Sequence, residues 1–166
     1  MIRAATERDD RAIGELLVAA FERTYARKMP EVRMSDERCA ELRAVASKRA
    51  VARVWVFDEG GAVVGTVAVW PAGAKGSEAW IPGACDLRHL ATDEAHRGGT
   101  VSGALLDVAE AWARAANAPA ICLHVRRGAV GVRKIYEARG YTRRPEGDLD
   151  FLPEVFLEAL ALPLAP

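Results

Sequence analysis

A glycine-rich turn near the middle of the chain carries the residues best suited to bind an anion. Arg97, Gly98 and Gly99 follow an expected strand over residues 85–91 and lead into an expected helix over residues 99–116, which contains Gly103. A helix N-terminus offers unsatisfied N–H groups and a partial positive charge, which suits a phosphate. Glycine permits close backbone approach, and arginine adds a fixed cation. The segment therefore predicts a phosphate site, although a glycine-rich connection that binds nothing has the same pattern.

Two common nucleotide-binding loops do not fit this spacing. The interval from Gly98 to Gly103 resembles G-x-x-x-x-G, but Ala104 and Leu105 stand where such a loop needs Lys and Ser or Thr. Glycines at 98, 99 and 103 also fail the G-x-G-x-x-G pattern of dinucleotide-binding folds. The predicted phosphate site therefore belongs to another class.

The elements around the turn alternate between helix and strand along the chain. Apolar residues recur at helical spacing after Thr6, which is a preferred N-cap type, and again over residues 35–50. The period changes to two on both sides of the turn signal at residues 58–61, which predicts a β-hairpin. The other expected segments are a loop over 71–83, strands over 2–5, 120–125 and 155–162, a strand beginning near Tyr141, a helix over 129–139 closed by Gly140, and the loop RRPEGDLD over 143–150. This order predicts a mixed α/β fold around one central sheet, with about seven strands and about four helices.

Composition and charge limit the classes of protein that this chain can be. A chain of 166 residues fits one domain, so we expect residues 1–166 to fold as a single domain. Lys plus Arg equals Asp plus Glu, 23 against 23, which argues against a nucleic-acid partner. Three cysteines and three histidines without paired spacing predict no metal site. No apolar run approaches the length of a membrane span, so we expect a cytoplasmic protein without a membrane partner.

Three motifs make the chain resemble the GNAT superfamily of N-acetyltransferases. Residues 97–102 read Arg-Gly-Gly-Thr-Val-Ser and occupy the frame Arg/Gln-x-x-Gly-x-Gly/Ala of its acetyl-CoA motif, and GALL follows. Leu-Ala-Thr at 90–92 matches the strand whose backbone pairs with the pantetheine arm, and YEARGY at 136–141 matches Tyr-x-x-x-Gly-Phe/Tyr. The resemblance covers essentially the whole chain and implies a GNAT-like acyl-CoA N-acyltransferase fold with a mostly antiparallel sheet. The cofactor-binding residues that it implies are Leu90, Ala91, Thr92, Arg97, Gly98, Gly99, Thr100, Val101, Ser102 and Gly103.

The resemblance implies an N-acetyltransferase that moves an acetyl group from acetyl-CoA to a primary amine. Tyr136 occupies the position of the general acid, which would protonate the departing thiolate. No cysteine occupies a motif position, so we expect direct attack by the amine without a covalent acyl-enzyme. The general base stays open among Asp86, His89 and His124, each of which is more often an ordinary strand residue. The implied acceptor is a small-molecule or peptide amine, and a homodimer is left open.

Three departures from the family pattern leave a second function open. Thr100 stands where Gly is usual, Ser102 where Gly or Ala is usual, and Ala129 replaces an Asn that is common before the tyrosine helix. A side chain restricts close backbone approach, so a catalytically silent acyl-CoA-binding or regulatory domain is the alternative. Retention of Arg97 and Tyr136 favours the enzyme.

Overall fold

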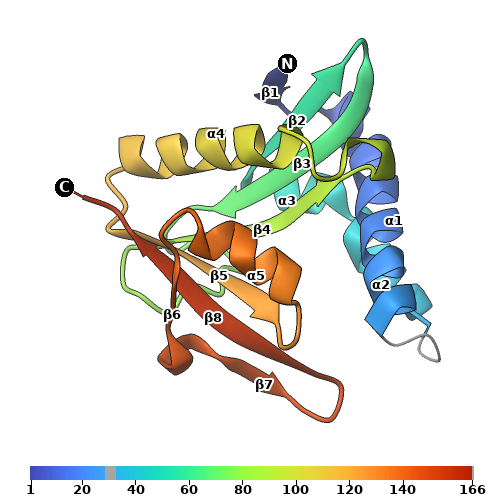
Figure 1. The fold of residues 1–166 in the computed structure, drawn as a ribbon. Helices are drawn as coiled ribbons and strands as arrows, with labels where there is room; N and C mark the ends of the chain where they lie inside the picture. The colour runs from blue at the N-terminus through green and yellow to red at the C-terminus, as the bar shows by residue number, and fades with distance from the viewer. Residues whose placement is uncertain (29–32, 166) are drawn as a thin grey trace. The chain divides into compact units, whose positions relative to one another are not determined.

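Eight strands and five α-helices make up the described part of the chain, residues 1–28 and 33–165 of a computed structural model (Figure 1). The strands are β1 (Ile2–Ala4), β2 (Arg53–Glu59), β3 (Ala62–Trp70), β4 (Cys85–Thr92), β5 (Ala120–Arg126), β6 (Thr142–Arg143), β7 (Leu149–Phe151) and β8 (Val155–Pro163). The α-helices are α1 (Asp10–Lys28), α2 (Asp36–Arg43), α3 (Val45–Arg49), α4 (Val101–Ala115) and α5 (Val130–Glu137). Three short 3-10 helices are η1 (Glu7–Asp9), η2 (Glu94–His96) and η3 (Pro145–Gly147). Within these residues, no helix has the length and apolar character that a membrane crossing needs.

The strands form one sheet with the order β1-β2-β3-β4-β5-β8-β6, and β7 pairs with β8 outside this path. β4 and β5 run parallel, whereas β1 pairs antiparallel with β2, and β8 pairs antiparallel with β5, β6 and β7. The predicted fold class, mixed α/β around one mostly antiparallel sheet, is therefore confirmed. The sheet has one strand more than expected, because β7 forms partly from the segment predicted as a loop and pairs Phe151 with Val155.

The helix expected over residues 35–50 is wrong in one respect, because the structure breaks it at Ala44. That residue has ψ 56, which lies outside the helical region, and α3 begins directly after it. Each half is held separately by α1, since Arg43 pairs with Glu15 at 2.9 Å and Arg49 pairs with Asp10. Alanine is a strong helix former, so tertiary contacts override local propensity here.

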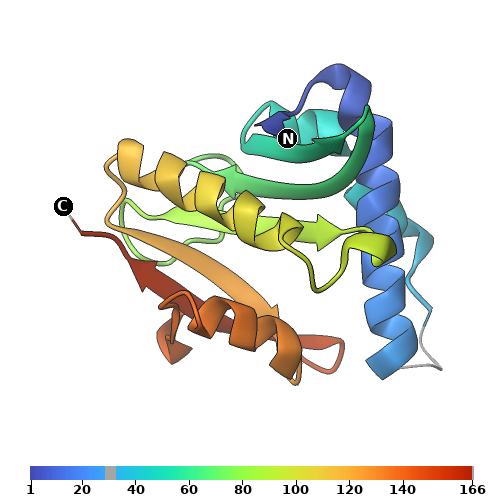
Figure 2. The same ribbon diagram turned by 45° about the horizontal axis from the view of Figure 1, so that its top comes forward.

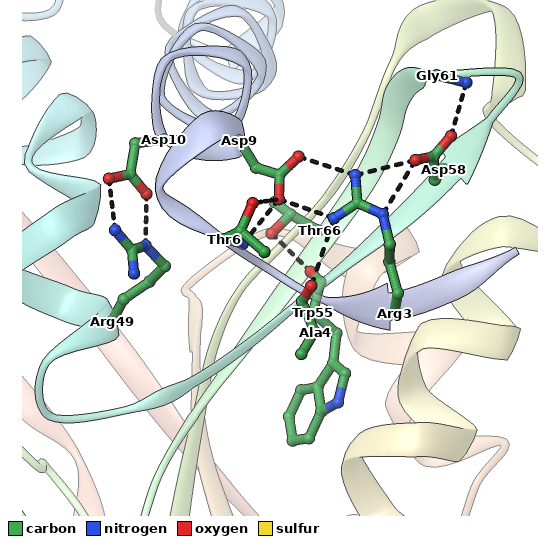
Figure 3. A network of polar contacts seen from close by, with 10 residues as sticks. All are labelled: Arg3, Ala4, Thr6, Asp9, Asp10, Arg49, Trp55, Asp58, Gly61 and Thr66. Atoms are coloured by element: carbon green, nitrogen blue, oxygen red, sulfur yellow. Dashed lines mark hydrogen bonds and ion pairs between the residues drawn. The ribbon is translucent and has the colours of Figure 1, made fainter.

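The chain divides into two compact units. The first comprises Met1–Ala68 and His89–Ala109, and the second comprises Val69–Arg88 and the chain from Glu110 onward. In the first unit, β2 and β3 form the expected hairpin, whose turn holds Gly60 and Gly61 at φ 62 and 92. Asp58 closes the turn, because its Oδ1 accepts from the Gly61 N–H at 2.7 Å (Figure 3). The sequence signal for this turn therefore has a physical basis, because glycine adopts left-handed backbone conformations without strain.

An arginine on β1 joins this hairpin to η1, directly before α1 (Figure 3). Arg3 donates to the two carboxylate oxygens of Asp9 at 2.8 and 2.9 Å, and to Asp58 Oδ2 at 3.0 Å. Asp9 also accepts from the Thr6 N–H at 2.7 Å, so Thr6 lies at the N-cap of η1 as expected, although its hydroxyl makes no capping bond. The Arg3 guanidinium lowers the pKa of Asp9. The pair therefore stabilises the fold at neutral pH, and this contribution is lost as pH falls through the lowered value.

In the second unit, α5 lies across one face of β5 and β8 (Figure 1). β5 pairs with β8 along its whole length, from Ala120 opposite Pro163 to Arg126 opposite Leu157. Its apolar residues are buried as the continuous run AICLHV predicts, and Cys122 among them is a buried free thiol.

The loop between β3 and β4 is part of the second unit and packs there through Trp80. The indole meets His124 edge-on, with ring centroids 5.2 Å apart. A Cβ atom added to Gly147 would lie 2.2 Å from Trp80 Cδ2. Glycine at this position therefore leaves the space that the indole fills.

Candidate active site

The segment between β4 and α4 forms the turn that the sequence predicts (Figure 2). Asp93 caps η2, because its Oδ1 accepts from the His96 N–H at 3.0 Å. The chain then passes through Arg97 in an extended conformation and Gly98 at φ 73, and α4 begins at Val101. Residues 97–100 are exposed. Because the first N–H groups of α4 have no partner within the helix, the turn presents a partly positive surface.

The Arg97 side chain is available to a ligand. It is exposed and has no hydrogen bond or ion pair to any residue that the structure describes. The first turn of α4 carries no acidic residue, so no carboxylate of that turn competes for the helix terminus. A free guanidinium beside unpaired helix N–H groups can bind an anion.

The glycines of the turn are required by the fold to different degrees. A Cβ atom added to Gly98 or Gly103 would meet no atom within 4 Å. Gly98 still needs glycine for its positive φ. Gly103 lies inside α4 without a positive φ, where glycine costs about 0.5–1 kcal/mol relative to alanine. The fold gives no reason for glycine at Gly103, and the open space there suits the close approach of a ligand.

Gly65 in β3 positions α4 and is a residue that sequence analysis missed. A Cβ atom at Gly65 would lie 2.6 Å from Val101 Cγ1 and 2.9 Å from Leu105 Cδ1. The first turns of α4 can therefore lie against β3 only because this strand residue has no side chain. The signal was present, since a lone glycine inside the apolar run AVVGTVAVW marks a close approach.

The residues predicted to pair with the pantetheine arm end β4 just before the turn. Ala91 is buried, while Leu90 and Thr92 are half-buried. Arg23 of α1 donates to the carbonyl oxygen of Thr92 at 3.1 Å, so this oxygen already has a protein partner. His89 has φ 58, a left-handed conformation that is uncommon for a non-glycine residue. The strand is therefore locally distorted where the predicted pairing begins.

Tyr136 lies on α5 in the second unit, and its side chain is buried. Its ring meets Tyr141 edge-on, with centroids 5.4 Å apart. Burial raises the pKa of Tyr136 well above its usual value near 10. A phenol keeps its proton at neutral pH even at its usual pKa, and burial reinforces this state, which a general acid needs.

A buried carboxylate fixes the ring against which Tyr136 packs. The Tyr141 hydroxyl donates to Glu110 Oε1 at 3.4 Å, and Arg139 donates to the same carboxylate at 2.8 and 2.9 Å. Burial, and then the Glu110 charge, raise the pKa of Tyr141. This bidentate pair joins α4 to the end of α5 and holds the tyrosine pair in place.

The candidate bases in the second unit have different surroundings. Asp86 is fully buried, and its Oδ2 accepts from Arg88 Nε and from the Glu78 N–H, each at 2.7 Å. Asp86 Oδ1 is buried and has no hydrogen-bond partner among the described residues. His124 Nε2 lies 2.8 Å from the Gly147 carbonyl oxygen, to which it donates, and the side chain is only 6% exposed. These are the contacts of a hydrogen-bonded core histidine.

The structure brings together the predicted cofactor-binding residues at 90–92 and 97–103, all of which lie in the first unit. The second unit holds Tyr136 and Asp86. Over residues 1–28 and 33–165, no group of three or more His, Cys, Asp or Glu side chains is arranged to hold a metal ion.

The exposed turn suits an enzyme that binds a phosphorylated ligand, and comparison with known families gives its class. The acetyltransferase (GNAT) domain family matches residues 50–143. The chain belongs to the GNAT family of acetyltransferases. A search of curated protein sequences gives no significant match.

Solved structures share this fold over nearly the whole chain at low sequence identity. A GNAT-family acetyltransferase from Staphylococcus aureus Mu50 is 14% identical with a TM-score of 0.75, and the match covers 99% of each chain. One from Desulfovibrio desulfuricans is 13% identical with a TM-score of 0.75, again over 99% of each chain. One from Brucella melitensis, solved in complex with acetyl-CoA, is 21% identical with a TM-score of 0.65, covering 100% of this chain and 88% of that chain. At such identities the likeness shows the fold alone.

Proposed function

We propose that the enzyme binds the phosphates of acetyl-CoA at residues 97–103 and transfers the acetyl group to a primary amine. The observation that carries this proposal is the exposed turn, where Arg97 has no described protein partner and Gly103 leaves space that the fold does not need. The guanidinium and the N–H groups at the start of α4 would bind phosphate oxygens. The Brucella melitensis relative was solved with acetyl-CoA, which supports this donor.

The other residues of the proposed cofactor site contribute mainly backbone groups. Gly98 and residues 100–102 offer N–H groups, whereas the Gly99 N–H already donates to the His96 carbonyl oxygen. The hydroxyls of Thr100 and Ser102 add further donors. Leu90 and Ala91 offer strand backbone to the amide groups of the pantetheine arm. The Thr92 carbonyl is less available, because Arg23 already donates to it.

The proposed reaction is a direct transfer. The neutral amine nitrogen attacks the thioester carbonyl carbon, the C–N bond forms, and the C–S bond breaks as the CoA thiolate leaves. The Tyr136 hydroxyl gives the thiolate a proton. A covalent route through cysteine is disfavoured for Cys85 and Cys122, because burial raises the pKa of both thiols.

The proton that the attacking amine loses needs an acceptor, and Asp86 suits this role better than His124, the other candidate base of the second unit. Its Oδ2 is engaged by Arg88 and the Glu78 N–H, whereas its Oδ1 is free of described donors. A carboxylate oxygen without a donor can take a proton directly or through one water. His124 instead donates to a backbone carbonyl, which favours a packing role.

A catalytically silent acyl-CoA-binding domain is the second candidate. Thr100 and Ser102 place side chains in the turn, and Ala129, the N-cap of α5, makes no side-chain capping bond. Both candidates predict acetyl-CoA binding, but only the enzyme consumes the thioester.

Release of CoA thiol separates the two candidates. The purified protein is incubated with acetyl-CoA and small primary amines, aminoglycosides, amino acids or peptides with a free N-terminus. Amine-dependent thiol release with at least one class is the expected result. Binding of acetyl-CoA without release across the whole panel would support the silent domain instead.

We further propose that residues 1–166 act as a single cytoplasmic domain, alone or as a homodimer. The balance of 23 basic and 23 acidic residues supports an enzyme without a nucleic-acid partner. The proposed acceptor is a small-molecule or peptide amine, and the proposed chemistry uses neither a metal nor a membrane.

A further inference from the structure

His96, the last residue of η2, holds both ring nitrogens against carboxylates. Nδ1 contacts Asp93 Oδ1, and Nε2 lies 2.8 Å from Glu59 Oε2. An ionised carboxylate accepts hydrogen bonds and cannot donate them, so each nitrogen must carry a hydrogen. The arrangement is therefore complete only when His96 is an imidazolium ion.

This imidazolium ties two strands of the first unit to the turn. Glu59 is the last residue of β2. Asp93 follows β4, and its N–H donates to the Val64 carbonyl oxygen of β3 at 2.9 Å. The His96 carbonyl oxygen accepts from the Gly99 N–H at 3.3 Å, and the exposed turn begins at the next residue. The His96 ring thus links the hairpin to the first residues of the proposed phosphate site.

Loss of the His96 proton changes both the contacts and the charge of this cluster. A neutral imidazole has one N–H, so one carboxylate loses its donor. Glu59 is the partner freer to leave, because its side chain is 62% exposed and that of Asp93 is 38% exposed. One imidazolium and two carboxylates carry a net charge of minus one, which becomes minus two beside a site for a polyanion.

We propose that His96 is a positioning residue for acetyl-CoA. Its imidazolium holds the turn at residues 97–103 in the conformation that binds phosphates, so affinity falls as rising pH removes the proton. This inference rests on the proposed function, specifically on the phosphate site at that turn.

Two carboxylates contact the ring, and other charged groups lie in neighbouring segments. Glu59 comes from β2, and Asp93 comes from the segment after β4. Glu94 shares η2 with the ring, and Arg97 follows directly. Arg23 comes from α1, and its charge helps the imidazole to lower the pKa of Asp93. The carboxylates nearest the ring therefore act to retain its proton.

The direction of the pH effect follows from these contacts. Hydrogen bonds to Asp93 first, and then to Glu59, raise the pKa of His96 above its usual value near 6.5. A group whose pKa is raised in the folded protein contributes fully below its unfolded value, and the contribution is lost as pH rises through the raised value. Acetyl-CoA affinity should therefore decline above neutrality and not below it.

The test is calorimetric titration of the full-length protein with acetyl-CoA between about pH 6.5 and pH 9, a range set by the usual histidine value. The wild type should lose about three- to tenfold in affinity, as for a partly exposed ion cluster. His96→Arg keeps a cation with several donors and should bind with little pH dependence. His96→Gln should bind weakly across the range. Ionisation of the cofactor phosphates affects all three proteins equally. The ratios of their acetyl-CoA affinities at each pH therefore report on His96.

Linkage supplies a second readout that a merely structural histidine would not move. If the protonated ring favours binding, then bound acetyl-CoA must raise the pKa of His96 further, because coupling is reciprocal. NMR titration of the imidazole signals with and without acetyl-CoA measures this, with His124, whose side chain is buried, as the control. Suppose that affinity depends on pH in the same way in wild type and His96→Gln, and that acetyl-CoA does not change the pKa of His96. The inference is then wrong, while the proposed function stands. Absence of acetyl-CoA binding at every pH would overturn the proposed function as well.

Discussion

The turn at residues 97–103 and the surroundings of Tyr136 show two ways in which this protein prepares a group for chemistry. At the turn, the Arg97 side chain bonds to no residue that the structure describes, and no described atom fills the space beside Gly103. Around Tyr136 the opposite holds, because the ring is buried against Tyr141, which Glu110 holds in turn. The first region can recognise an anion at no cost to packing, whereas the second holds its phenol in a fixed, buried position.

This difference separates the expected effects of substitution. Changes at the turn should alter cofactor affinity and leave the free energy of unfolding almost unchanged. Changes around Tyr136 should alter the rate of transfer or the stability, with little effect on affinity. A turn substitution that lowers stability, or a substitution around Tyr136 that weakens acetyl-CoA binding, would contradict this distinction.

Tyr136→Phe should have the largest effect. Loss of a general acid typically costs about 10²–10⁴-fold, and water partly substitutes, so we expect at least about a tenfold loss in the transfer rate. The ring remains, so the KM for acetyl-CoA and the melting temperature should move little. Single-turnover measurement with enzyme in excess of acetyl-CoA removes any contribution from product release.

Tyr141→Phe is the matched control, because it removes a hydroxyl from the partner ring, which donates to Glu110 at 3.4 Å. It should cost about 0.5–1.5 kcal/mol of stability and leave the transfer rate intact. A preserved rate in Tyr136→Phe, with stability lowered by more than about 1 kcal/mol, would make the Tyr136 hydroxyl structural.

Arg97→Ala should weaken acetyl-CoA binding by about 1.5–3 kcal/mol, the usual value of a hydrogen bond to a charged group. The melting temperature should stay the same, because the side chain is exposed and contacts no described partner. Arg53→Ala is the control, since Arg53 is also exposed and lies in the first unit. Equal affinities in the two variants would leave phosphate binding to backbone N–H groups alone.

Gly65→Ala and Gly103→Ala make the same change in two environments and should give the smallest but most contrasting effects. At Gly65 the new Cβ would lie 2.6 Å from Val101 Cγ1, so overpacking should cost about 1–3 kcal/mol of stability. At Gly103 it meets no protein atom within 4 Å, so stability should rise by about 0.5–1 kcal/mol while acetyl-CoA affinity falls. Denaturant unfolding and calorimetry measure the two quantities. Unchanged affinity in Gly103→Ala would mean that the open space is not used by the cofactor.

Much of the fold could be predicted because its signals are local. The hairpin depends on Gly60 and Gly61, the end of α5 depends on Gly140 at φ 97, and α4 follows from helical spacing after the turn. The break at Ala44 had no local signal, since alanine favours a helix and only the folded chain shows Arg43 and Arg49 paired with α1. β7 was predicted as loop because a short strand inside a polar segment with proline and glycine is defined only by its pairing with β8.

The candidate site was predictable as a set of residues, and its surroundings were not. Motif spacing locates the turn and Tyr136, and their roles stay predictions. Sequence could not show that His96 meets Glu59, because 37 residues separate them. Nor could it show which oxygen of Asp86 is free, because the donors at its other oxygen come from a loop and from the same strand. Long-range contacts of this kind depend on the packed fold.

The central claim, that the turn binds acetyl-CoA, is tested most directly by titrating the wild-type protein with acetyl-CoA in a calorimeter. We predict saturable binding, and by mass action a gain of about 2.7 kcal/mol in the free energy of unfolding at 100 times the dissociation constant. The claim is contradicted if the protein shows no heat of binding and no shift in thermal unfolding at about 1 mM acetyl-CoA, the upper end of common Michaelis constants.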